Sequence, residues 1–193
     1  DILLFTNGIL LNEINSKKIL KSSITRLFVS IDGATSETYN KVRIPVSDRL
    51  KNSNRLEELE NNIKKFIDMR EDSNLELPIV RTSFVALDIN LFEREKFINK
   101  WINIVDSVEV QRETSIKAYD DIRSGKYNIK DNVKTYDCSE PWGQVTIYSD
   151  GTVTPCCNTV GRNVPIGNVK NESLKEIWSG KLMKDIRDGF LIN

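Results

Sequence analysis

The sequence has 193 residues, and its 28 lysines and arginines balance 28 aspartates and glutamates, so the formal net charge is zero. This length allows one good hydrophobic core with a small appended unit, and the balanced charge gives no reason to expect a nucleic-acid or membrane partner. The chain contains no histidine, which excludes Ser-His-Asp and Cys-His nucleophiles and histidine-ligated metals.

The chain has three cysteines, an odd number with two of them adjacent, which is not the pattern of a secreted disulfide framework. No apolar run approaches the ~20 residues of a membrane span, and no signal peptide is visible. We therefore expect a cytoplasmic protein.

The first half of the chain alternates strand and helix patterns. The continuous apolar run Ile2–Phe5 predicts a buried parallel strand that ends in a turn at Thr6-Asn7-Gly8. Further strands are expected at Arg26–Asp32, at 78–86 and at Ser107–Gln111. Between these strands we expect helices near residues 10–20, from a Thr35 cap to Val42, over 56–70 and over 92–105, with a polar loop at 44–54.

This alternation predicts βαβ units around a parallel sheet, and therefore an α/β fold. On two of these strands, polar side chains lie on the face opposite the apolar residues that helices would cover. They are Ser30 and Asp32 on the second strand and Glu109 and Gln111 on the fourth. Polar residues at the carboxyl ends of strands are where an α/β barrel binds its ligand. The alternative is an edge or a solvent-facing surface.

The three cysteines surround a predicted hairpin. Asp150-Gly151 lies between two short β-favouring runs, Gln144–Tyr148 and Thr152–Pro155, and this dipeptide favours a tight turn. Such a hairpin can bring Cys156 and Cys157 back beside Cys138, as in a soft-metal or iron–sulfur site. Buried, unreactive thiols are the alternative, because the spacing is not that of a zinc knuckle.

The last segment carries a helix signature. Ser173 and Glu176 form a capping box at the start of an apolar pattern that runs through Ile186, with Gly189 at its expected end. We expect Trp178 to be a core residue rather than a ligand platform.

Residues 138–178 contain four short motifs whose order and spacing resemble those of the SPASM domain of radical SAM enzymes: "EPW" after Cys138, "DGTVTPCC", "IGNV" and "SLKEIW". The resemblance implies an auxiliary [4Fe–4S] cluster with Cys138 and Cys156 as ligands, while the role of the second paired cysteine, here Cys157, varies in the family. The further cysteines of that domain do not occur in the 193 residues.

"TNG" at residues 6–8 and "SIDGATSETYNKVR" at 30–43 resemble the third and fourth strands of a radical SAM partial (β/α)6 barrel. The resemblance implies a partial TIM-like barrel at residues 1–111 (strands three to six), a linker at 112–137 and a truncated SPASM domain of hairpin plus helix at 138–193. It also implies that Ser30 binds S-adenosylmethionine, with Asn7, Asp32, Arg43, Arg81, Ser83 and Gln111 as further candidates. Asp32 has a structural alternative, in which it fixes the turn into Gly33.

The family's CxxxCxxC motif does not occur in this sequence. We therefore expect a fragment that does no radical chemistry by itself, taken from an enzyme that generates a 5′-deoxyadenosyl radical. The resemblance implies a peptide, sugar or small metabolite as substrate, and flavodoxin or ferredoxin as electron donor. The alternatives are a non-catalytic homologue that binds S-adenosylmethionine or a partner, a single-cluster electron-transfer module, and a hairpin with structural zinc or no metal.

Overall fold

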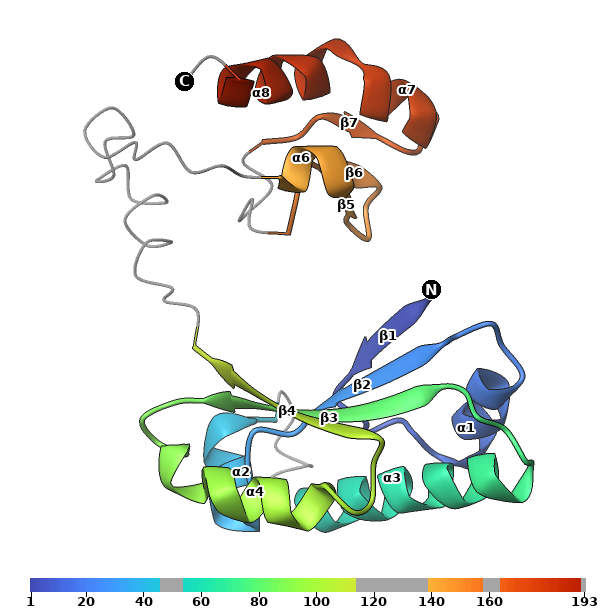
Figure 1. Ribbon diagram of the computed structural model, residues 1–193, viewed down its shortest axis with the longest axis vertical. Coiled ribbons are helices and arrows are strands. Elements are labelled where there is room, and N and C mark those ends of the chain that lie inside the picture. The colour runs from blue at the N-terminus through green and yellow to red at the C-terminus, as the bar shows by residue number, and fades with distance from the viewer. Residues whose placement is uncertain (46–53, 114–138, 158–163, 192–193) are drawn as a thin grey trace. The chain divides into compact units, whose positions relative to one another are not determined.

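The computed structural model describes residues 1–45, 54–113, 139–157 and 164–191, which belong to two compact units, Asp1–Thr114 and Ser115–Asn193 (Figure 1). The predicted linker at 112–137 lies almost wholly outside the described residues, as does most of the polar loop at 44–54. The predicted domain boundaries at 111 and 138 therefore stay predictions.

The first unit is an α/β layer with a four-stranded parallel sheet in the order β1-β2-β3-β4. This arrangement confirms the βαβ units expected from the alternation of patterns. The strands are β1 (Leu3–Thr6), β2 (Arg26–Ser30), β3 (Ile79–Ala86) and β4 (Ser107–Arg112). The helices are α1 (Glu13–Leu20), α2 (Ser36–Val42), α3 (Arg55–Asp72) and α4 (Arg94–Trp101), with a 3₁₀ turn η2 (Leu91–Glu93) before α4.

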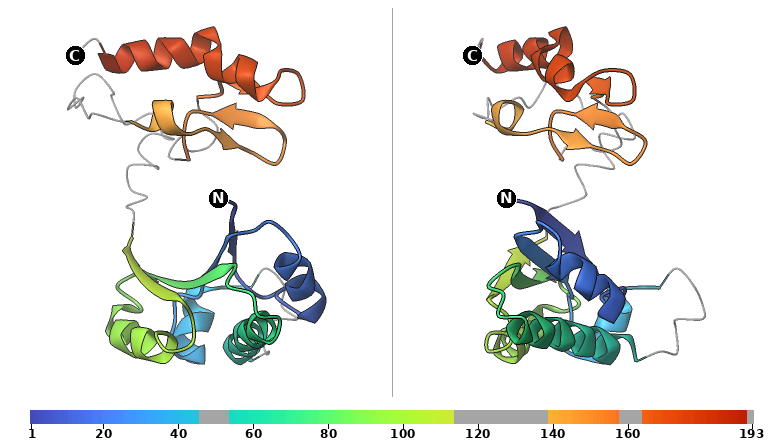
Figure 2. Two further views of the ribbon diagram at one scale, coloured as in Figure 1. Left: turned by 45° about the vertical axis from the view of Figure 1, so that its right-hand side comes forward. Right: turned by 90° about the vertical axis from the view of Figure 1, so that its right-hand side faces the viewer.

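The helices lie on one face of this sheet (Figures 1 and 2). Alternate strand residues point into the layer between helices and sheet, where the hydrophobic core lies. Thr35 caps α2 as predicted, with its hydroxyl oxygen accepting the Thr38 amide. The core joins Leu27, Val29, Ile31, Val80 and Phe84 of the sheet region to Leu59, Ile63, Phe66, Phe97 and Trp101 of α3 and α4.

Two expectations about this unit were wrong. Leu3 and Phe5 are 42% and 66% exposed, because they lie on the face of β1 that the helices do not cover. The helix expected over 92–105 is shorter: Phe92 lies in the 3₁₀ turn with 77% exposure, and α4 ends at Trp101.

The second unit is built on a three-stranded antiparallel sheet in the order β5-β6-β7. The predicted hairpin joins its first two strands, and Gly151 takes the positive φ of +89° that the turn requires. A small core of Val153, Ile166, Ile177 and Met183 holds the sheet to the helices. The elements are α6 (Glu140–Gly143), β5 (Thr146–Ile147), β6 (Thr152–Thr154), β7 (Gly167–Asn168), α7 (Leu174–Ser179) and α8 (Lys181–Leu191).

The capping box of Ser173 and Glu176 forms as predicted. The single helix expected after it is instead two helices, because Gly180 adopts an extended backbone with φ −70° and ψ 167° between α7 and α8. Gly189 lies inside α8 and does not end it. No helix in the described part of the chain combines the length and hydropathy needed to cross a membrane.

Candidate functional site

The helix-free face of the parallel sheet carries the polar side chains that were expected to meet a ligand. Ser30 on β2 is in register with Ser83 on β3, and the two hydroxyls are 3.4 Å apart, with Ser83 Oγ as the donor. Glu109 on β4 is the next residue in this row. The row lies toward the carboxyl end of β2, where the edge of a parallel sheet binds ligands.

Arg81 lies one row nearer the start of the strands. Its Cζ is 4.3 Å from the centroid of the Phe28 ring, its Nη1 donates to Glu109 Oε2 at 3.0 Å, and its Nε donates to Ser107 Oγ at 3.3 Å. Three protein groups therefore fix the guanidinium against the sheet. Arg81 and Ser83 share one face of β3, as the sequence predicts, and the structure shows that this is the face that the helices do not cover.

Asp32 lies just past the end of β2 and connects three segments. Its backbone has a positive φ of 61°, and its side chain is nearly inaccessible. Asp32 Oδ1 accepts the Val85 amide at 2.7 Å, while Oδ2 forms an ion pair with Arg43. These partners agree with the structural alternative for Asp32, and they connect Arg43 to the same loop.

Gly33 follows Asp32, and its position requires a residue without a side chain. A Cβ built there would lie 2.7 Å from the backbone nitrogen and 2.8 Å from the Cα of Tyr39 in α2. The backbone of Gly33, in the loop after β2, therefore packs directly against the backbone of Tyr39 in α2.

Asn7 and Gln111 lie at the same edge of the sheet, and both are exposed. Asn7 follows β1 and accepts the Ile9 amide at 3.2 Å, and Gln111 pairs with Val85 in the register of β3 and β4. The structure thus brings Ser30 beside Ser83, Asp32 beside Arg43, and Arg81 beside Glu109.

Two polar residues after β3 escaped the sequence analysis, although both are almost fully buried. Asn90 is 0% exposed and Glu93 is 4% exposed, and each makes three hydrogen bonds to backbone or hydroxyl groups. The available signal was their spacing of three residues around the apolar pair Leu91-Phe92, which places both on one side of a helical turn.

Burial raises the pKa of Glu93, but hydrogen bonds from the Thr35 hydroxyl and from the Ala34 and Thr35 amides outweigh it. The pKa of Glu93 therefore lies below its ordinary value of 4.5. At neutral pH this buried residue is a carboxylate that accepts hydrogen bonds from the start of α2.

The paired cysteines follow β6 directly. Cys156 is half-buried and Cys157 is exposed. The hydroxyl of Thr154, itself fully buried, donates to the carbonyl oxygen of Cys156 at 3.1 Å and fixes the backbone there. Cys138 lies outside the described residues, so the predicted gathering of three thiols stays a prediction. Within the described ranges, no group of three or more cysteines or carboxylates is placed to hold a metal ion.

Arg187 of α8 connects this unit's first helix to its last two. Its Nε donates to the Pro141 carbonyl at 2.9 Å and its Nη1 to the Trp178 carbonyl at 3.1 Å. Its Cζ also lies 4.3 Å from the Trp178 ring centroid. Trp178 packs against the small core, in agreement with its assignment as a core residue.

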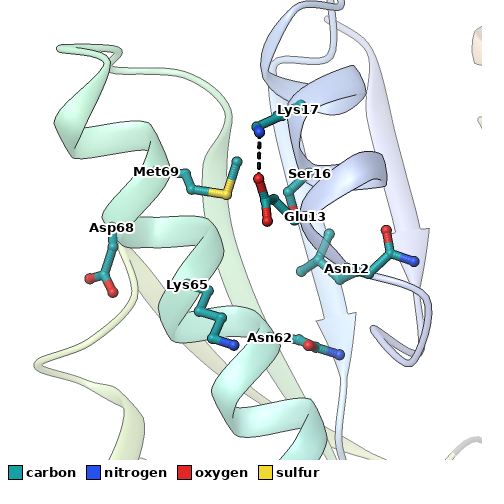
Figure 3. A pocket seen from close by; sticks show the side chains of 9 residues that line it. Asn12, Glu13, Ser16, Lys17, Asn62, Lys65, Asp68 and Met69 are labelled. Atoms are coloured by element: carbon teal, nitrogen blue, oxygen red, sulfur yellow. Dashed lines mark hydrogen bonds and ion pairs between the residues drawn. The ribbon is translucent and has the colours of Figure 1, made fainter.

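A cavity of about 430 Å³ lies between α1 and α3 (Figure 3). Glu13 and Lys17 form an ion pair on one wall, and Lys65 and Asp68 line the other. This mixture of exposed charges favours no ligand class, so the cavity is not a candidate site.

Comparison with known proteins gives one family match. Residues 138–192 match the SPASM family model, which is described as an iron–sulfur cluster-binding domain. No curated protein matches the chain.

Several solved structures share the fold, among them the following three. A polyhistidine-tagged anSMEcpe with bound AdoMet aligns with a TM-score of 0.60 and 16% identity, over 95% of this chain and 55% of that one. Streptococcus suis SuiB bound to S-adenosylmethionine gives a TM-score of 0.63 and 15% identity over 96% and 49%, and SuiB alone gives 0.61 and 14% over 96% and 50%. The chain spans about half the length of these structures.

At this level of identity the likeness shows the fold alone. The match to residues 138–192 and the shared fold confirm the resemblance stated from the sequence: the chain shares the fold of about half of these AdoMet-binding structures, and residues 138–192 match the SPASM domain.

Proposed function

We propose that this chain is part of a radical SAM/SPASM enzyme that binds S-adenosylmethionine at the carboxyl edge of β1–β4 and an auxiliary [4Fe–4S] cluster in its SPASM domain. The observation that carries the proposal is a SPASM domain in the same chain as a parallel sheet whose open face has Ser30 and Ser83 side by side.

Ser30 is the residue we propose to contact S-adenosylmethionine, at its methionine or ribose portion. The Ser30 hydroxyl can both donate and accept, and Ser83 Oγ already orients it from the neighbouring strand. Asn7 and Gln111 are exposed at the same edge and are available as further polar partners. Asp32, Arg43 and Arg81 have protein partners, so we assign them to holding the site rather than to the ligand.

Thiolates are the donors that iron–sulfur clusters require, and Cys156 has the half-buried setting and fixed backbone that suit a ligand. We propose Cys156 and Cys138 as ligands, with Cys157 as a weaker one. In the intact enzyme, S-adenosylmethionine bound at a reducing cluster would supply a 5′-deoxyadenosyl radical for hydrogen abstraction from a peptide, sugar or metabolite. The CxxxCxxC motif for that cluster does not occur in these 193 residues. The proposed electron donor is a flavodoxin or ferredoxin, and the proposed compartment is the cytoplasm.

The test is equilibrium dialysis of S-adenosylmethionine against the native protein, expressed from its whole gene and purified without oxygen. Ser30→Ala should weaken binding about fivefold, the scale of one lost hydrogen bond of about 1 kcal/mol. Ser73→Ala is the control, since Ser73 is exposed and its hydroxyl donates to the Met69 carbonyl of its own helix end. Unchanged affinity in Ser30→Ala would remove Ser30 from the site, and a native protein that binds no S-adenosylmethionine would contradict the proposed function.

A further inference from the structure

The loop that follows Ser30 is held by two distant side chains: Asn90 lies 58 residues after its partner Asp32, and Glu93 lies 59 residues after its partner Ala34. Asn90 is the first. Its Oδ1 accepts the Leu87 amide at 2.7 Å, and its Nδ2 donates to the carbonyl oxygens of Val85 at 2.9 Å and Asp32 at 3.0 Å. Asn90 therefore joins the end of β3 to Asp32, in the loop that follows β2.

Glu93 is the second, one helical turn after Asn90. Its Oε2 accepts the Ala34 amide at 2.7 Å and the Thr35 amide at 3.2 Å, and its Oε1 accepts the Thr35 hydroxyl at 2.5 Å. A carboxylate that is 4% exposed is stable only with such compensation, because an unpaired buried charge is costly. These three hydrogen bonds all come from the two residues just before α2.

The same loop is tied from its own side. Asp32 accepts the Val85 amide and pairs with Arg43, and its positive φ is uncommon for a residue that carries a side chain. Such a conformation persists only where the surroundings determine it. Asn90 and Glu93 are part of those surroundings, since between them they fix residues 32, 34 and 35.

We infer that Asn90 and Glu93 are positioning residues for the ligand site at Ser30: they hold the loop from Asp32 to Thr35 so that the Ser30 hydroxyl stays beside Ser83. This inference rests on the proposed function, because Ser30 is the group that it positions. Neither residue contacts the ligand. Their effect is to fix the carboxyl ends of β2 and β3 before the ligand arrives, which lowers the ordering cost of binding.

The deciding variant is Glu93→Gln in the native protein, expressed from its whole gene. Glutamine keeps the size of the side chain but replaces one acceptor oxygen with a donor, so one or more of the donors at residues 34–35 loses its partner. Glu95→Gln is the matched control, because Glu95 is exposed on α4 two residues away. Glu93→Ala removes both acceptors and should show the larger effect if the protein still folds.

Two quantities are measured for each variant: amide hydrogen exchange at Ala34 and Thr35, and the dissociation constant for S-adenosylmethionine. We expect Glu93→Gln to speed the exchange at least about tenfold, the scale of one lost hydrogen bond to a charged group, and to weaken binding at least about fivefold. Glu95→Gln should match the wild type in both. Glu93→Ala should exceed Glu93→Gln in both quantities.

Faster exchange with unchanged affinity would overturn the positioning role and leave only a structural one. Unchanged exchange would overturn the claim that Glu93 holds the loop. If the wild-type protein binds no S-adenosylmethionine, the proposed function fails and the positioning role fails with it. If the wild type binds it and Glu93→Gln binds equally well, only the positioning role fails.

Discussion

The guanidinium of Arg81 lies over the ring of Phe28 and donates to Glu109, so one side chain connects three neighbouring strands of the open sheet face. Phe5 of β1 meets the same Phe28 ring edge to face, with 5.0 Å between centroids. These contacts cross the whole sheet from β1 to β4, next to the pair of Ser30 and Ser83.

Arg81→Lys should lower the free energy of unfolding by about 1 kcal/mol, because lysine keeps the charge but loses the planar stacking and the forked donation. The ion pair with Glu109 is partly exposed, so we expect the low end of the range for such contacts. Urea unfolding is the measurement, with Arg94→Lys on exposed helix surface as control. Equal midpoints for the two variants would show that the stacked geometry contributes nothing.

Asp106→Asn should destabilise the first unit at neutral pH by about 2 kcal/mol, less than the cost of breaking a fully buried pair, because Asp106 is partly exposed. Asp106 accepts Arg70 at 2.5 and 3.1 Å and the Val80 amide at 2.6 Å, and Arg70 is almost fully buried. The midpoint of urea unfolding at pH 7 measures this loss, and an unchanged midpoint would show that Arg70 finds other partners.

The same carboxyl predicts a dependence of stability on acid. Burial raises the pKa of Asp106, but the hydrogen bonds from Arg70 and Val80 and the charge of Arg70 bring it below the ordinary 3.8. The unfolded chain then binds the proton more readily, so this contribution is complete above the unfolded pKa and is lost as pH falls through the folded pKa. Urea unfolding from neutral pH down to about pH 3 should show a shallower acid slope in Asp106→Asn than in the wild type. Identical acid slopes for the two proteins would show that Asp106 does not have a lowered pKa in the folded state.

Gly33→Ala and Gly189→Ala should have opposite effects on stability. The new Cβ at residue 33 would meet the Tyr39 backbone at 2.7 Å, and we expect a loss of about 2 kcal/mol or more from overpacking. At residue 189, inside α8, nothing lies within 4 Å, and alanine should stabilise by up to about 1 kcal/mol through helix propensity. Thermal unfolding of both variants tests this, and a tolerated Gly33→Ala would show that α2 can move away from the loop.

Cys138→Ala and Cys156→Ala should each abolish iron–sulfur absorbance after anaerobic reconstitution of the native protein, while Cys157→Ala should be milder because Cys157 is exposed. Iron and sulfide analysis gives the same comparison without the spectrum. If both single variants retain a full cluster, the assignment of Cys138 and Cys156 as ligands is wrong.

The elements that the sequence predicts well are those that depend on nearby residues. The Thr35 cap, the Ser173–Glu176 capping box and the Asp150-Gly151 hairpin all depend on residues close together in the chain, and all form. The strand–helix alternation was equally readable, since each element needs only its own periodicity.

The expectations that failed depend on neighbours distant in the sequence. Phe5 was expected to be buried because its run is apolar, but which side of β1 the helices cover is decided by the whole sheet. Gly180 separates α7 from α8, although the apolar periodicity continues across it.

In the candidate site, Ser30 and Asp32 were found from their motif, but their supports were not. The contact of Glu93 with Ala34 joins residues 59 apart, and no local pattern identifies such a pair. The roles assigned to the site residues stay predictions until ligand binding is measured.

The alternation of faces along β2 and β3 has a consequence for how such a protein changes over generations. Leu27, Val29, Val80 and Phe84 maintain the core, while Phe28, Ser30, Arg81 and Ser83 lie between them on the opposite side of the same strands. A substitution in the second set need not disturb packing in the first. The scaffold can therefore change polar positions such as Ser30 and Ser83 through neighbouring codons, while selection for core packing acts on the residues between them, and Arg81 with Phe28 adds stability on the other side.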